Sequence, residues 1–210
     1  METPLEYLCR TRSAVEHLFN GIDAYHAILR RSRPPVLAGT FSCQAEHDIE
    51  VARWISENSE EIQRGLSAER AFLAEKYALA VLCGSLLHIA SKAIQLYSGQ
   101  SQVPSEFASF VSSTHASFCI GREVRGVPLG LVILAGRNQY NHLEDDHLRE
   151  PSSTVFERLA TQHCYGADVR DPAFDLAARL VWNYACNVTS LIGWQYYESY
   201  EKDMRSLLGV

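Results

Sequence analysis

The sequence predicts an all-α protein, built as a single bundle of antiparallel helices. Apolar residues recur at helix-like spacings over most of the chain, and no segment shows the alternation of a half-buried strand. The chain has 210 residues, of which 47% are hydrophobic, so it can bury a sizeable core. No tract is low in complexity and nothing in the composition indicates a second unit, so we expect residues 1–210 to form one domain.

Four helices are expected in the first half of the chain, separated by turn-forming residues. Asn-Gly at 20–21 and Pro-Pro at 34–35 mark two breaks, and Gly65 is placed as a C-cap. The expected helices are 5–19, 22–31, 45–63 and 67–97. The middle of the last one, "YALAVLCGSLLHIA", is apolar nearly all round, which is typical of the central helix of a bundle. We therefore interpret His88, which lies in it, as a core histidine.

The second half continues the helical pattern with more interruptions. "GREVRG" is a break, and Pro128 follows it at a position that the first turn of a helix tolerates. The expected helices are 106–120, weakly, then 127–145, 153–162 and 173–206. The last one carries "WNYACNVTSLIGWQYYESY", whose aromatic rings have no Lys or Arg among them, so we expect a subunit interface there rather than base stacking.

Composition also restricts the compartment and the partners. The six cysteines are scattered without a CxxC pair, which favours reduced thiols over disulfides or a zinc site. No signal peptide is evident, and each apolar stretch is shorter than the roughly 18 residues that a bilayer span requires. These features predict a soluble, cytoplasmic protein with no membrane partner. The net charge of −6 argues against broad nucleic-acid binding but is compatible with a local basic cleft.

Chemistry is most strongly indicated by "RNQYNH" at 137–142, which follows the apolar run "VPLGLVILAG". On a helix, Asn138 and His142 are four residues apart and share one face, so the amide can orient the imidazole. Arg137 lies roughly 140° round the helix from His142, within reach of the same cleft. Gly136 lacks a side chain and lets another backbone approach.

These residue types suit phosphodiester cleavage. A guanidinium is a permanent cation whose fork matches phosphate oxygens. An imidazole exchanges protons near neutral pH. With Arg137 on the phosphate, His142 in proton transfer and Asn138 orienting, a 2′-hydroxyl could attack the neighbouring phosphorus without a metal or another cofactor.

This arrangement resembles the R-x4-6-H motif of the HEPN domain family, including the asparagine that many members carry after the arginine. The resemblance implies a bundle of four to five main helices with short extra ones. It also implies a homodimer in which Arg137, Asn138 and His142 of both copies line one RNA cleft. The implied activity is that of a metal-independent endoribonuclease of single-stranded RNA, often in toxin–antitoxin or antiviral systems with a partner protein. Some members have a modified tyrosine two residues after the histidine, where this chain has Glu144.

Several alternatives stay open. A non-functional interpretation of 137–142 is a helix end whose polar groups contact solvent. "HLEDDH" at 142–147 is likewise better explained as a solvated helix end than as a metal site. Arg122 and Arg125 precede the motif helix and are candidates for holding the RNA backbone. The acidic residues after His142 would repel RNA unless they point away from the cleft. A non-catalytic HEPN-like module that binds RNA or protein, or a helical regulatory or structural protein, are the rival functions.

Overall fold

The computed structural model describes residues 3–30, 36–143, 147–163, 169–178 and 183–210. It confirms an all-α helical bundle: apart from one two-residue strand pair, the described elements are helices. The contacts between residues divide the chain into two compact units, Met1–Asn20 with Ala80–Val210, and Gly21–Leu79, each treated by itself below. The single-domain organisation stays a prediction.

The first three helices differ in their boundaries from those expected. Helix α1 (Pro4–Arg30) continues through Asn20 and Gly21, so the Asn-Gly pair does not break it. Helix α2 (Gln44–Glu57) ends at Asn58, and α3 (Ser59–Ala74) begins directly after it. Gly65 therefore lies inside α3, where it is buried, and is not a C-cap. The breaks fall at Asn58 and Glu75, neither of which is a glycine or a proline, and the sequence pattern missed them.

Helix α4 (Lys76–Tyr97) is buried on one side only, in contrast to the expectation of a central helix. Val81 and Leu96 are exposed, and so is His88, which is not a core histidine. Among the described helices, α4 alone is long and apolar enough to span a membrane, but 56% of its most apolar window is buried inside the protein. Such burial is typical of the core helix of a soluble protein; cytoplasmic localisation stays a prediction.

The segment after α4 contains two 3-10 helices, η1 (Ser105–Phe107) and η2 (Ser113–Phe118), in place of the single weak helix expected. Strands β1 (Glu123–Val124) and β2 (Val127–Pro128) then form an antiparallel hairpin, which the sequence analysis did not predict. Arg125 and Gly126 form its turn, with φ values of 50° and 68°. Two consecutive left-handed residues are typical of the tight hairpin turn that matches strand twist.

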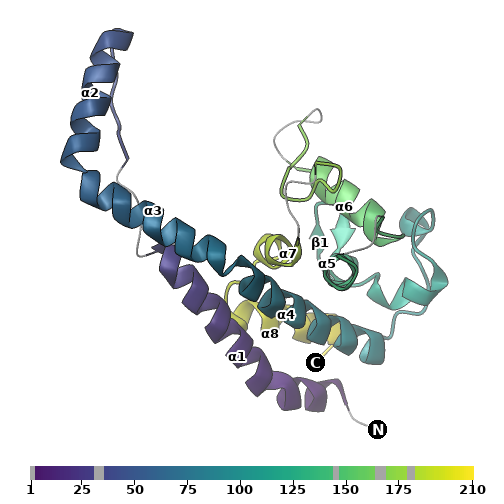
Figure 1. Ribbon diagram of the computed structural model, residues 1–210. Helices are drawn as coiled ribbons and strands as arrows, with labels where there is room; N and C mark the ends of the chain where they lie inside the picture. Colours follow the sequence, from purple (N-terminus) through teal and green to yellow (C-terminus); the bar gives the residue numbers. More distant parts are fainter. Residues whose placement is uncertain (1–2, 31–35, 144–146, 164–168, 179–182) are drawn as a thin grey trace. The chain divides into compact units, whose positions relative to one another are not determined.

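Helix α5 (Leu129–Asn141) is the helix buried all round: every residue from Leu129 to Gly136 is buried. Its first turn is capped by the preceding loop, because the Leu129 and Gly130 amides donate to the Arg122 and Ile120 carbonyls at 2.9 and 3.0 Å. Figure 1 shows α6 (Ser152–Thr161), α7 (Ala185–Leu191) and the β1–β2 hairpin gathered around it. Helix α5 thus occupies the centre of its unit.

The long C-terminal helix expected over 173–206 is divided into α7 and α8 (Tyr197–Leu208), with Gly193 at a φ of 78° between them. Trp194 and Tyr200 are buried against each other, their ring centroids 4.9 Å apart, and Tyr200 also contacts Phe19 of α1 at 5.9 Å. These rings belong to the core of their own chain, so the expected interface role does not apply to them. Trp182, also assigned to that interface, lies outside the described residues.

Candidate functional site

The predicted motif lies where α5 emerges from the core. The first two turns of α5 are apolar and buried, whereas Arg137 and Asn138 are half-buried and His142 is exposed. His142 is the C-cap residue, and its backbone amide donates to the Asn138 carbonyl at 3.0 Å. The helix dipole favours positive charge at this end, so an arginine and a histidine suit it electrostatically.

Gly136 allows close packing, but against side chains rather than another backbone. A Cβ atom there would lie 3.0 Å from Leu87 of α4 and 3.0 Å from Val188 of α7. One turn later, the Tyr140 ring occupies the space over Gly84, where a Cβ would be 2.5 Å from it. A Cβ atom at Gly84 or Gly136 would force neighbouring atoms to shift. The two glycines therefore allow α5 to pack this closely against α4 and α7.

Arg137 and Asn138 are joined in a short relay to α6. Arg137 Nη1 donates to Asn138 Oδ1 at 2.8 Å, and Asn138 Nδ2 donates to Ser152 Oγ at 3.0 Å. Ser152 is fully buried at the start of α6. Through these contacts Asn138 orients the Arg137 side chain. That Asn138 also orients the His142 imidazole stays a prediction.

One N–H group of the Arg137 guanidinium, at Nε, has no hydrogen-bond acceptor among the described residues. The Nε atom is buried. A buried N–H without a partner costs about 1–3 kcal/mol, and more when the group is charged. An anionic oxygen is the natural acceptor for this donor.

A cavity of about 320 Å³ lies beside the end of α5. It joins residues from η2, from α5 and from the segment leading to α6. The lining residues are His115, Asn138, His142, His147, Leu148, Arg149 and Glu150. Two of the three predicted catalytic residues therefore share a cavity with two further histidines and a second arginine, with Arg137 hydrogen-bonded to one wall.

Among these histidines, His115 comes from a different element, η2. Burial and the positive charge of Arg137 lower the pKa of its imidazole, so it is neutral at neutral pH. Its Nδ1 lies 3.0 Å from Ser112 Oγ. Burial and the charges of Arg137 and Lys92 also lower the pKa of His88 on α4. The field of Arg137 thus reaches imidazoles on two other elements.

Arg122 and Arg125, the predicted RNA-backbone contacts, both bind within the chain. The Arg122 guanidinium holds both Asp203 oxygens at 2.9 and 3.1 Å and the Ile192 carbonyl at 2.6 Å. Arg125 pairs with Asp171 at 2.8 Å and lies over the Phe174 ring. These contacts tie the β1–β2 hairpin to the C-terminal half, a structural role for both arginines.

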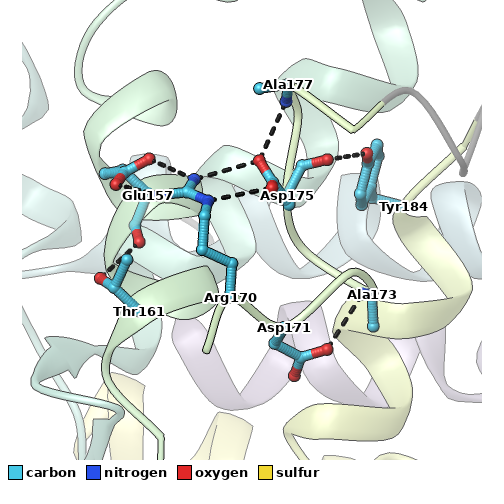
Figure 2. Close-up of polar contacts among 8 residues, drawn as sticks. All are labelled: Glu157, Thr161, Arg170, Asp171, Ala173, Asp175, Ala177 and Tyr184. Carbon is cyan, nitrogen blue, oxygen red and sulfur yellow. Dashed lines mark hydrogen bonds and ion pairs between the residues drawn. The ribbon is translucent and has the colours of Figure 1, made fainter. Parts of the chain in front are cut away.

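An ion-pair network joins Glu157, in the middle of α6, to Arg170 and Asp175 (Figure 2). Arg170 donates to both oxygens of Glu157 at 2.7 Å and to both oxygens of Asp175 at 2.9 and 3.0 Å. The hydrogen bonds from Arg170 lower the pKa of both carboxyls. The Asp175 carbonyl in turn accepts from the buried Tyr184 hydroxyl at 2.9 Å, which connects α6 to the start of α7.

Sequence reasoning missed His115, His147 and Arg149 as cavity residues. His115 is 27 positions from His142, and neither helical periodicity nor motif spacing relates them. The acidic residues 144–146, which bear on the metal alternative, lie outside the described residues. Within the described ranges, no group of three or more His, Cys, Asp and Glu side chains could hold a metal ion.

Comparisons with known proteins add no relative. No family model, no curated protein and no solved structure matches the chain.

Proposed function

We propose that this protein is a metal-independent endoribonuclease that cleaves single-stranded RNA in the cavity at the end of α5. The observation that carries the proposal is the shared cavity: His115, His142 and His147 line it together with Asn138 and Arg149. Arg137, hydrogen-bonded to Asn138, adds a guanidinium whose buried Nε suits a phosphate oxygen. The resemblance of "RNQYNH" to the HEPN motif supports the same chemistry.

Two of the histidines that line the cavity, His115 from η2 and His142 from the end of α5, suit opposite proton transfers. His115, neutral because of burial and the Arg137 charge, accepts the proton of a ribose 2′-hydroxyl. The 2′-oxygen then attacks the adjacent phosphorus, and the bond from phosphorus to the 5′-oxygen breaks. His142, at the helix end that favours a cation, donates a proton to that leaving oxygen. The products are a 2′,3′-cyclic phosphate and a 5′-hydroxyl.

Arg137 stabilises the charge that builds on the phosphate. A guanidinium held in place before the reaction contributes without reorganisation, and the relay through Asn138 to the buried Ser152 holds this one. Arg149, from the cavity wall, adds a second cation for the RNA backbone. The overall acidity of the chain confines RNA binding to this local site.

The HEPN resemblance extends the proposal to a cytoplasmic homodimer that brings two copies of α5 to one cleft. In that arrangement the protein acts as a toxin or antiviral component, with an antitoxin or other partner protein. Light scattering of the purified protein tests the dimer. Cross-linking of Asn141→Cys tests whether the motif residues lie at the dimer contact, with the unsubstituted chain, which exposes Cys9 and Cys43, as the control.

The test of the activity is RNA cleavage by the full chain in EDTA. We expect single-stranded RNA to be cut to cyclic-phosphate ends, and Arg137→Ala, His142→Ala and His115→Ala each to lower kcat about 10²–10⁴-fold, the range of general acid–base contributions. His17→Ala changes an exposed histidine on α1 and should cut as the wild type does. Unfolding curves of each variant separate lost chemistry from a lost fold.

The outcomes distinguish the rival functions. RNA that binds but is not cut indicates a non-catalytic module. Wild type and variants that neither bind nor cut RNA indicate a regulatory or structural protein. Cleavage that disappears in EDTA contradicts the metal-independent mechanism, and cleavage that survives His115→Ala removes the base from the scheme while leaving His142 in it.

A further inference from the structure

Helices α2 and α3 have almost no core of their own. In the Gly21–Leu79 unit, the buried hydrophobic side chains among the described residues are those of Ile22 and Leu79, and neither belongs to α2 or α3. Helix α2 has no buried residue at all. Isolated helices of about 12–15 residues are marginal in water, because most helical stability comes from packing an apolar face. A 14-residue helix with nothing buried therefore lacks its normal source of stability.

The exposed apolar residues of α2 lie on one face of that helix, and those of α3 do the same. On α2, Ile49 and Ile55 are 68% and 49% exposed and share a face with the exposed Ala52. The other side of α2 contacts the preceding loop, where His47 meets the Phe41 ring at 5.0 Å. On α3, Leu66 and Leu73 are 41% and 53% exposed and seven residues apart, which places them on one face. We call Ile49, Ile55, Leu66 and Leu73 the open face.

Acidic residues outnumber basic ones along the two helices that carry the open face. Residues 44–74 contain seven acidic and three basic side chains, a net charge of −4 out of −6 for the whole chain. The acidic ones are Glu46, Asp48, Glu50, Glu57, Glu60, Glu61 and Glu69. Hydrogen bonds from Ser42 lower the pKa of Glu46, and those from His47 and Gln44 lower that of Asp48, so both are ionised at neutral pH. A surface hollow on α3 is lined by Ser59, Glu60, Gln63, Arg64 and Ser67, so it holds one acidic and one basic side chain.

This combination determines the chemistry of what binds there. RNA and anionic lipid are repelled by a local charge of −4, and a second copy of the chain brings the same negative charge to the contact. Exposed apolar residues on helices with a net negative charge match an amphipathic helix whose polar flanks carry lysine or arginine. We propose that the open face of α2 and α3 binds a basic amphipathic helix of a second protein. The proposal is independent of RNA cleavage.

The test titrates the full-length protein with two synthetic 18-residue helical peptides. Both have leucine at the same i, i+3, i+4 and i+7 positions, and the polar face carries lysine in one and glutamate in the other. We expect the lysine peptide to bind at least 10-fold more tightly, to lose affinity as salt rises, and to slow amide hydrogen exchange in residues 44–57. Equal binding of the two peptides, or protection confined to other parts of the chain, overturns the proposal.

Variants locate the binding to the open face. Ile49→Ser with Ile55→Ser should weaken the lysine peptide at least 10-fold, and Leu5→Ser with Leu96→Ser, which changes two exposed leucines on α1 and α4, should not. If the isoleucine variant does not fold, Glu46→Gln with Asp48→Asn tests the same surface through charge, again with weaker binding expected. Binding that is unchanged by the charge variant, or self-association that depends on Ile49, identifies a different occupant and overturns the proposal.

Discussion

Helices α5 and α2 are nearly equal in length and opposite in environment. The first eight residues of α5 are all buried, whereas α2 buries none. Helix α5 is packed so closely against its neighbours that Gly130 and Gly136 leave no room for an added methyl group unless neighbouring atoms shift. Helix α2 exposes its apolar side chains Ile49 and Ile55. The protein thus combines a closely packed helix, which carries the candidate site, with a helix that has no buried residue.

Truncating one large side chain on each helix should have very different consequences for stability. Leu131→Ala empties a fully buried position of α5 and should lower the free energy of unfolding by about 2–5 kcal/mol. Ile49→Ala on α2 removes a side chain that contacts mainly water, so the change should stay within about 0.5 kcal/mol. Urea unfolding measures both. A large loss for Ile49→Ala would mean that α2 is packed in solution.

A smaller loss of stability is expected at Gly130, where the backbone of α5 lies against the backbone of η2. A Cβ at Gly130 would lie 2.4 Å from the Phe118 carbonyl oxygen, which cannot move without displacing η2. Gly130→Ala should therefore cost about 1–3 kcal/mol, despite the better helix propensity of alanine. Gly99→Ala, with nothing within 4 Å of the added atom, is the matched control and should be neutral or slightly stabilising. If the two variants unfold alike, the first turn of α5 is looser than the structure shows.

The sequence predicted the helical class and some elements well. The helix expected over 153–162 is confirmed as Ser152–Thr161, because its apolar residues lie on one clear face against α5. The all-round apolar helix was assigned wrongly: composition pointed to α4, but α4 exposes Val81 and Leu96, and α5 is the enclosed one. Apolar content alone does not say on how many sides a helix has neighbours.

The candidate site was predictable only in part, for a physical reason. Arg137, Asn138 and His142 lie within one helix end, where spacing determines which residues share a face. His115 and Ser152 reach the same place through tertiary folding, from η2 and α6. Gln139 is a similar case: its buried Oε1 accepts the Tyr184 amide at 3.0 Å across 45 residues. No local pattern encodes such contacts.

The buried relay between α5 and α6 gives the next prediction. Ser152→Ala removes the acceptor of the Asn138 amide, so stability should fall by about 0.5–1.5 kcal/mol. RNA cleavage should fall as well, because Asn138 then holds Arg137 less firmly. Ser153→Ala, the half-buried neighbour in sequence, is the control for both measurements. A variant that loses stability but cleaves at the wild-type rate would show that the relay does not position the arginine.

The smallest effect is expected from the ion pairs on the far side of α6. The pKa of Glu157 is lowered by Arg170, so its contribution to stability is present above the unfolded pKa, about 4.3, and disappears as the pH falls through the lower folded value. Since Glu157 is more than half exposed, Glu157→Gln should cost no more than about 1 kcal/mol at pH 7. The difference from the wild type should shrink in 1 M salt and should decrease as the pH falls from 7 towards 3.

Thermal unfolding of wild type and Glu157→Gln over pH 3–8 measures this contribution. Glu60→Gln, on the open surface of α3, serves as the control at pH 7 and should leave stability unchanged. A difference that stayed constant from pH 8 down to pH 3 would mean that the Glu157 side chain stabilises α6 through packing, not charge. Asp175, whose side chain is far less exposed and bonds the same guanidinium, would then be the residue that holds Arg170 in place.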